Sequence, residues 1–449
     1  MIRNGVKVSA QMDISMKPLS CRDKLEYALD RIADPKGEGA RTVLTVYADA
    51  ARAAAHAADA RVALGISLGP LDGAIVTIKD LFDVAGEVTR AGSKVLAEEG
   101  KLAATDAVVV RRLRAAGAVI VGKTNMSEFA FTAIGVNPHF GTPGNPADRG
   151  RVPGGSSSGA AVAVADGMCE IAIGSDTGGS VRMPAALCGI VGFKPSRQRV
   201  STEGAFPLSY SFDSIGPLAR SVADCAKADA ILAGEDFSPL LPATLDGLRV
   251  GLVEGPPLAN LDDTVATAFT AAIGTLDRAG IRLAREKLSL LDDMAAVDAK
   301  GGIIGAEACA VHGDRISRRG SDIDANVRYR IDRGRDISAA DFVDMARKRG
   351  RLIRAMDEAL ECFEALVMPT IPIVAPTIAE VAEQKAFSAS NAVVRRNTVI
   401  GNFFDLCAVS LPLSATLPVG LMLLARNGGD RKLLGIAAAV MDILQRDAN

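Results

Sequence analysis

The chain has 449 residues, of which 49% are hydrophobic and 4% aromatic, with no tryptophan and a formal net charge of −2. This composition supplies a large core and excludes a strongly basic nucleic-acid surface or an aromatic platform for single strands. The seven cysteines are scattered and form no CxxC pair, which predicts reduced thiols in a cytoplasmic protein. We expect no membrane contact, because the chain has no run of about 18 apolar residues and residues 1–20 contain no apolar signal segment.

The first predicted elements alternate between helix and strand. Residues 20–65 have a helical pattern, and GAIVTIKD (73–80) is a β-branched run that predicts a strand ending at Lys79 and Asp80. Residues 105–117 predict an amphipathic helix, which a buried strand over 118–122 follows. This alternation indicates an α/β fold.

Residues 137–195 are rich in Gly, Pro and Ser, but apolar runs interrupt them, so they predict a packed core and not a linker. Its expected order is loop, helix (160–168), strand (170–176) and loop.

The rest of the chain is predicted to be helical in its middle and strand-rich near its end. The predicted helices cover 222–234, 262–280 and most of 290–365, in which 318–337 is expected to be an exposed excursion. Strands are predicted within 366–377, 402–413 and 417–425, followed by a terminal helix.

Two motif matches fail on their context. GAVIVGKT (117–124) fits the phosphate-loop pattern, but the residues between its glycines form a strand and a helix precedes them. GSSSG (155–159) fits the nucleophile elbow around Ser157, but the prolines before it exclude a central strand. Neither match therefore defines the site.

Histidine is scarce, which excludes two large classes of hydrolase. The chain has only His56, His139 and His312, and their spacing fits neither a zinc site nor a Ser-His-Asp triad. We therefore expect no zinc site, and we expect the protein to use no metal and no cofactor.

Two Gly-Gly-Ser units, which end at Ser156 and Ser180, are the remaining candidates for chemistry. A helix and a strand separate them, and a unit of that size can bring its two loops side by side. In the second unit, residues 176–180, successive N–H groups of a tight turn can point at one anion beside the serine. By itself the same pattern also fits a plain glycine turn with a capping serine.

This region resembles the amidase signature family. The resemblance rests on PGGSSSGAA, on GSDTGGSVRMPAALCGIVGFKPS, and on a lysine at the strand end in VTIKD. Further similar elements follow in the family's order: GKTNMSEFA (122–130), GNP (144–146), FDSIGPLARSVAD (212–224), MPTIP (368–372) and LPVGL (417–421).

The resemblance implies a large mixed β-sheet flanked by helices on both faces, in a single domain over 1–449. Its parts would be an N-terminal helical segment (1–65), a catalytic core (70–235) and a helical excursion that bears specificity (290–365).

The resemblance also implies a Ser–Ser–Lys triad. Ser180 would be the nucleophile, Ser156 the bridging serine after a cis peptide bond, and Lys79 the terminal base. The N–H groups of residues 177–180 would bind the oxyanion. The other implied site residues are Thr177, Gly178 and Gly179 in that turn, Ser157 and Asp176 as hydrogen-bond partners, and Arg182 as a brace.

The implied chemistry is coherent. Serine needs a base, and burial without a carboxylate partner lowers the lysine pKa from about 10.4. A neutral Lys79 could then take a proton from Ser156, which takes one from Ser180. The reverse relay would protonate the leaving amine.

The function that the resemblance implies is an amidase that cleaves the C–N bond of a small carboxamide to a carboxylate plus ammonia or an amine. Residues 387–412 also resemble the branch that acts on small ureides. The alternatives are the glutaminase subunit of a tRNA-dependent amidotransferase complex and a binding protein without catalysis on the same fold. Family members are often dimers, so a homodimer is compatible with the resemblance.

Overall fold

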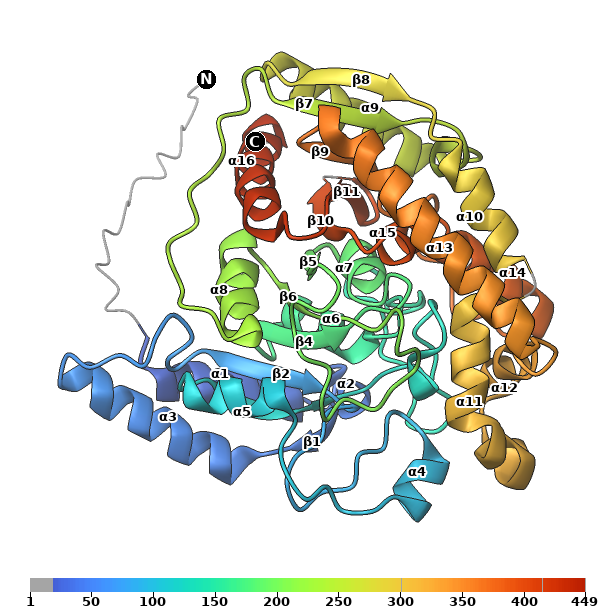
Figure 1. The fold of residues 1–449 in the computed structure, drawn as a ribbon. Coiled ribbons are helices and arrows are strands. Elements are labelled where there is room, and N and C mark those ends of the chain that lie inside the picture. The colour runs from blue at the N-terminus through green and yellow to red at the C-terminus, as the bar shows by residue number, and fades with distance from the viewer. Residues whose placement is uncertain (1–18, 300, 414, 449) are drawn as a thin grey trace, which may run out of the picture.

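A computed structural model describes residues 19–299, 301–413 and 415–448, and one β-sheet organises it (Figure 1). In this part of the chain the sheet has 11 strands. From edge to edge they are β1 (Val43–Val46), β3 (Val119–Thr124), β2 (Ile75–Lys79), β4 (Ile171–Ser175), β6 (Ile215–Ala219), β5 (Val191–Lys194), β10 (Cys407–Leu413), β11 (Val419–Ala425), β9 (Ala365–Pro369), β7 (Arg249–Val253) and β8 (Arg282–Glu286).

The sheet is mixed. Strands β3, β2 and β4 are parallel to one another, as are β9, β7 and β8. The strands between them pair in antiparallel fashion, for example β4 with β6 and β10 with β11.

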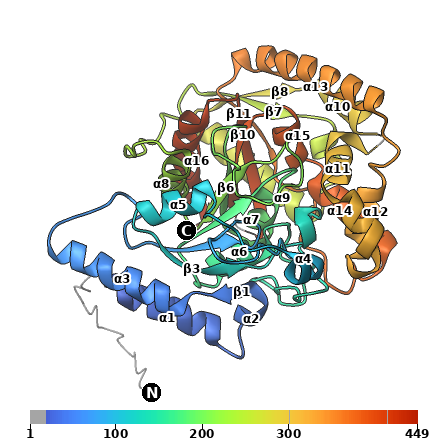
Figure 2. The ribbon, with the colours of Figure 1, turned by 60° about the horizontal axis from the view of Figure 1, so that its bottom comes forward.

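Helices cover both faces, because successive side chains of a strand point to opposite sides. Val76 and Ile173 join a hydrophobic cluster with α5 (Val108–Ala115), α8 (Val222–Ala233) and α16 (Asp430–Ala448). Their neighbours Ile75 and Ala172 join a second cluster with α1 (Cys21–Ala33), α3 (Ala48–Ala63) and α6 (Ser158–Ala165). This arrangement confirms the predicted α/β fold. Figure 2 shows α1 and α3 side by side at one edge of the molecule.

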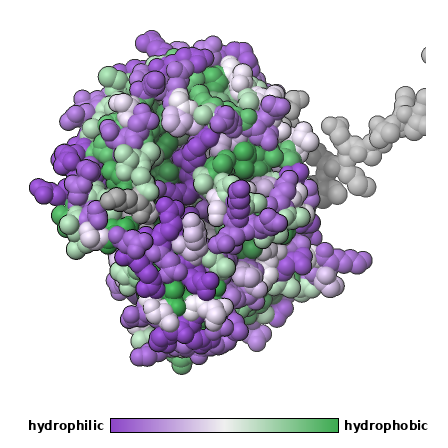
Figure 3. Space-filling model, turned by 90° about the vertical axis from the view of Figure 1, so that its right-hand side faces the viewer, coloured by the Kyte–Doolittle hydropathy of each residue, from purple (hydrophilic) through white to green (hydrophobic). Residues whose placement is uncertain are grey.

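A group of helices lies at one end of the molecule, on the right in Figure 1. It consists of α10 (Leu290–Asp298), α11 (Gly302–Arg319), α12 (Ala325–Asp332), α13 (Ala339–Ala359) and α14 (Gln384–Arg395). Hydrophobic patches lie among hydrophilic side chains on this face (Figure 3). The other helices are α2 (Gly39–Thr42), α4 (Lys94–Glu99), α7 (Arg182–Cys188), α9 (Asp263–Arg278) and α15 (Thr398–Phe403).

The structure corrects three sequence predictions. The predicted N-terminal helical segment contains the strand β1, because the β-branched run there pairs with β3; residues 1–18 of that segment lie outside the described residues. The excursion over 318–337 is not simply exposed, since α12 buries Val327 and Ile331. The strand predicted over 402–413 begins only at Cys407, because α15 and a turn at Asp405 precede it.

Candidate active site

Lys79 is the last residue of β2, and its side chain is fully buried. Its Nζ lies 2.8 Å from Ser156 Oγ and 2.9 Å from Ser175 Oγ. Strand β2 is paired on both sides, by β3 and β4, so the sheet fixes the backbone from which this side chain projects. The fold thus brings the predicted base into hydrogen-bond contact with the predicted bridging serine.

The surroundings of Lys79 favour the neutral amine. Burial lowers the pKa of Lys79 from 10.5 to about 7, against the opposing effect of the negative charges of Asp176 and Asp213. The amine's hydrogen-bond partners among the described residues are hydroxyl groups and not carboxylates. Near pH 7 a large share of Lys79 is therefore neutral, as a proton acceptor must be.

The two Gly-Gly-Ser loops lie side by side. The peptide bond between Gly155 and Ser156 is cis, as the resemblance implied. Ser157, which precedes helix α6, donates its N–H to the carbonyl oxygen of Ser180 at 3.3 Å. The hydroxyl of Ser157 donates to the carbonyl oxygen of Ser175, also at 3.3 Å. Ser157 is thus a link between the loops, and the predicted order of loop, helix, strand and loop is confirmed.

The turn before Ser180 requires glycine at position 179. Gly179 has a φ of 122°, and a Cβ there would collide with Thr398 Oγ1. Thr398 in turn donates its hydroxyl to the carbonyl oxygen of Gly178 at 2.8 Å. Helix α15, more than 200 residues later in the chain, therefore holds the shape of this turn.

One of the four expected oxyanion donors is already engaged. The Gly179 N–H donates to Asp176 Oδ1 at 2.8 Å, which departs from the expectation that it is free for an oxyanion. Within the described residues, no hydrogen-bond acceptor is recorded for the N–H groups of Thr177, Gly178 and Ser180. These three remain available to a ligand.

Asp176 and Arg182 form a buried ion pair beneath the turn. Arg182 donates to Asp176 through Nε at 3.1 Å and Nη2 at 3.0 Å, and both side chains are fully buried. Asn402 donates to the carboxylate at 2.8 Å and accepts from Arg182 at 2.7 Å. Burial alone would raise the pKa of Asp176, but the charge and hydrogen bonds of Arg182 hold it at about 2. Asp176 therefore stays ionised and anchors the turn.

Asp213 fixes the side chain of Thr177. It accepts from the Thr177 hydroxyl at 2.6 Å and from the N–H groups of Leu208 and Ser209. Burial raises the pKa of Asp213 to about 6. Both residues border a cavity of about 850 Å³, as does Ser175, a hydrogen-bond partner of Lys79.

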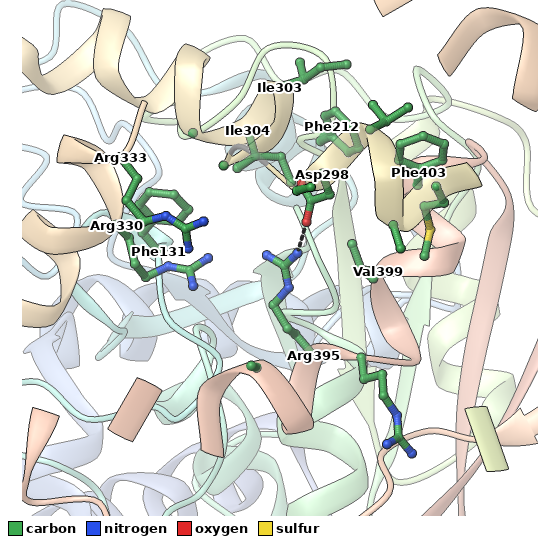
Figure 4. Close-up of a pocket in the computed structure, with 18 residues that line it drawn as sticks. Phe131, Phe212, Asp298, Ile303, Ile304, Arg330, Arg333, Arg395, Val399 and Phe403 are labelled. Atoms are coloured by element: carbon green, nitrogen blue, oxygen red, sulfur yellow. Dashed lines mark hydrogen bonds and ion pairs between the residues drawn. The ribbon is translucent and has the colours of Figure 1, made fainter. Parts of the chain in front are cut away.

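Ser180 is only 5% exposed and borders a narrow pocket, next to which lies a larger cavity. That cavity has a volume of about 410 Å³ and is bordered by helices α10, α11, α12, α14 and α15 (Figure 4). The pocket and the cavity share the wall residues Phe131, Ile304, Arg330 and Arg395, so they lie next to each other. A volume of this size suits a small organic molecule.

Sequence reasoning missed several residues of the site. Ser175 had a local signal, because it directly precedes Asp176 at a predicted strand end. Thr398 and Asn402 are polar residues four positions apart in an apolar stretch, a spacing that places them on one face of a helix. Arg330 and Arg395 had no signal, because arginines in charged helices usually face solvent.

Two further observations bear on the kind of protein. Within the described ranges, no group of three or more His, Cys, Asp or Glu side chains is placed to hold a metal ion. No helix in those ranges has the length and apolar character that crossing a bilayer requires.

Comparison with known proteins identifies the family. A family model described as amidase matches residues 23–434. A 2-amino-5-chloromuconic acid deaminase from Comamonas testosteroni is 36% identical over 400 residues, which cover 87% of this chain and 86% of that protein. The A-type subunit of the glutamyl-tRNA(Gln) amidotransferase from Anaeromyxobacter sp. (strain K) is 35% identical over 469 residues, with coverage of 95% and 94%. A crystal structure of an amidase superposes with a TM-score of 0.84 at 33% identity and covers 95% of this chain and 96% of its own. Because sequence and fold agree along nearly the whole chain, the protein belongs to the amidase signature family and is a hydrolase of C–N amide bonds.

Proposed function

We propose that the protein cleaves the C–N bond of a small carboxamide through an acyl-enzyme on Ser180, with Ser156 and Lys79 as its proton relay. The observation that supports this most directly is the buried amine of Lys79, which contacts Ser156 at 2.8 Å and whose pKa burial lowers to about 7. A lysine held in this state can act as a general base at neutral pH, in place of histidine.

The proposed reaction begins when Ser180 Oγ attacks the amide carbonyl. Its proton passes to Ser156, whose own proton passes to Lys79 Nζ. The N–H groups of Thr177, Gly178 and Ser180 stabilise the oxyanion. The C–N bond then breaks as the proton on Lys79 returns through Ser156 to the leaving nitrogen. Water, activated by the same relay, hydrolyses the acyl-enzyme and releases the carboxylate.

The cavity beside Ser180 supports a small acyl group as the substrate. Helices α10, α11 and α12, which lie within the predicted specificity segment 290–365, form much of its wall. We therefore infer that this segment selects the substrate. The names of the two relatives, a 2-amino-5-chloromuconic acid deaminase and a glutamyl-tRNA(Gln) amidotransferase component, differ in the compound that they mention, so they do not identify the substrate.

A second candidate function is that of a glutaminase subunit within a tRNA-dependent amidotransferase. The near full-length similarity to the A-type amidotransferase component favours it. Under that alternative, glutamine is the only good amide substrate and its hydrolysis depends on added amidotransferase partner chains.

The test combines covalent labelling with turnover. A fluorophosphonate probe should label the wild type on the peptide that contains Ser180, as mass spectrometry would detect. Ammonia release from a panel of primary amides should fall at least about 1000-fold in Ser180→Ala. Ser158→Ala is the matched control, because Ser158 is buried in α6 and its hydroxyl has no partner among the described residues. Turnover that survives in Ser180→Ala would refute the proposed nucleophile.

A further inference from the structure

The cavity next to the pocket of Ser180 is cationic. Arg330, Arg333, Arg395 and Arg396 line it, and Asp298 is the one carboxylate among its described lining residues. Figure 4 shows Arg330 and Arg333 entering from one side and Arg395 from another. Arg333 is exposed to solvent and Arg395 pairs with Asp298, so Arg330 is the cation in Ser180's pocket that lacks a counter-charge within the described part of the chain.

Arg330 has no ion-pair partner among the described residues. Its Nε is buried and has no hydrogen-bond partner in the same part of the chain, and its guanidinium lies 4.5 Å from the ring centre of Phe131. The residue as a whole is partly exposed, and it borders both the pocket of Ser180 and the larger cavity. Burial, with the nearby charge of Arg395, lowers the pKa of Arg330 to about 9, so the group remains cationic at neutral pH. Its guanidinium can therefore bind an anionic ligand.

Arg395 is only partly satisfied. Its Nη2 donates to Asp298 Oδ2 at 2.6 Å, so one carboxylate holds one corner of the guanidinium. Arg396, the next residue, donates instead to the carbonyl oxygen of Ala259 at 2.6 Å. Arg330 and Arg395 are therefore the two cations that border Ser180's pocket and the cavity together.

We propose that the substrate of this enzyme is anionic: a short-chain amide that carries a carboxylate, which Arg330 and Arg395 bind while the amide reaches Ser180. The planar donors of arginine match the two oxygens of a carboxylate, and Phe131 and Ile304 supply apolar walls for the intervening carbons. This inference rests on the proposed amide hydrolysis at Ser180 and adds the class of its substrate.

The experiment compares matched pairs of amides. The anionic probes are succinamate, glutaramate, adipamate and glutamine; butanamide, pentanamide and hexanamide replace the terminal carboxylate of the first three with a methyl group. We expect the wild type to prefer the best anionic probe over its neutral partner by at least about 30-fold in kcat/KM. Arg330→Met should remove most of that preference, chiefly through KM, and leave the neutral amides within about threefold. Arg330→Lys should restore part of it.

Stability gives a readout that a structural role for Arg330 would not produce. Because Arg330 has no ion-pair partner and its buried Nε has no hydrogen-bond partner among the described residues, Arg330→Met should keep or raise the melting temperature without ligand. Glutarate should raise the melting temperature of the wild type and not that of Arg330→Met. Arg354→Gln, an exposed arginine on α13, is the control and should behave as the wild type in both assays.

Two results would overturn the inference. One is equal turnover of anionic and neutral amides by both the wild type and Arg330→Met. The other is an identical response of the two proteins to glutarate. If the proposed hydrolysis is wrong, the result differs from both of these: Ser180 takes no fluorophosphonate label and no amide releases ammonia. The change in melting temperature with glutarate would still show whether Arg330 binds a carboxylate.

Discussion

The charge state of Lys79 can be tested by placing a carboxylate next to it. Ser175 Oγ lies 2.9 Å from Lys79 Nζ and borders the cavity of about 850 Å³, so Ser175→Asp brings a negative charge against the amine with space to accommodate it. A negative charge favours the protonated lysine and therefore raises its pKa. An opposite charge at this range changes a pKa by about one to three.

The size of the effect follows from the fraction of neutral amine. With an ordinary pKa of 10.5, about one lysine in 3000 would be neutral at pH 7, whereas a pKa of about 7 makes about one half neutral. If Ser175→Asp raises that pKa by about two, the neutral fraction at pH 7 falls to about one in 100. The rate at pH 7 should then fall about 50-fold and recover near pH 9 to 10.

The assay is the pH dependence of kcat/KM, measured by direct quantification of the carboxylate product from pH 5 to 10. In the wild type, kcat/KM should rise with pH through a midpoint near 7 and then level off, because the neutral amine is the active form. Ser175→Asn has the same shape as Ser175→Asp without the charge and serves as the control. Coincident midpoints for the Asp and Asn variants would show that the titrating group is not Lys79.

Two further predictions concern the turn before Ser180 and the ion pair beneath it. Gly179→Ala should lose at least about 2 kcal/mol of unfolding free energy in urea, because Gly179 has a positive φ and an added methyl group would collide with Thr398. Gly178→Ala is the control and should lose little, because its added methyl group meets no atom. Equal losses in the two variants would contradict this account. Arg182→Met should cost about 3–5 kcal/mol of unfolding free energy in the same assay, because it leaves Asp176 buried without its partner. The double variant Arg182→Met/Asp176→Asn should lose less than the sum of the losses of the two single variants. Losses that add in full would argue against the coupling.

Much of the sheet could be predicted because its strands carry a local pattern. The β-branched run that ends at Lys79 identified β2, and apolar runs between glycines identified β4. Strand β1 also contains a β-branched run, but this run is too short to be separated from the helical pattern around it. It has four residues at the edge of the sheet, and its pairing with β3 depends on a segment more than 70 residues away.

The same difference between local patterns and distant contacts separates the site residues that the sequence predicts from those that it does not. Lys79, Ser156 and Ser180 stand in short motifs that carry the resemblance, so the sequence alone could nominate them, and the structure places Lys79 in contact with Ser156. Arg330 was assigned to an exposed stretch, because a helix with many arginines normally presents them to water. In the structure Arg330 instead lines a cavity between several helices. A cavity of this kind depends on how distant segments pack, so no local sequence pattern predicts it.

The junction of helices α14 and α15 constrains how this enzyme can be altered. Arg395 lines the cavity, and only a few residues later Thr398 and Asn402 hold Gly178 and Asp176. An insertion or deletion at this junction would shift the cavity wall and the turn before Ser180 at once. Substrate preference can therefore be redesigned by exchanging side chains up to residue 396, provided that the chain length, Thr398 and Asn402 are kept. A chimera joined between α14 and α15 would lose turnover together with selectivity.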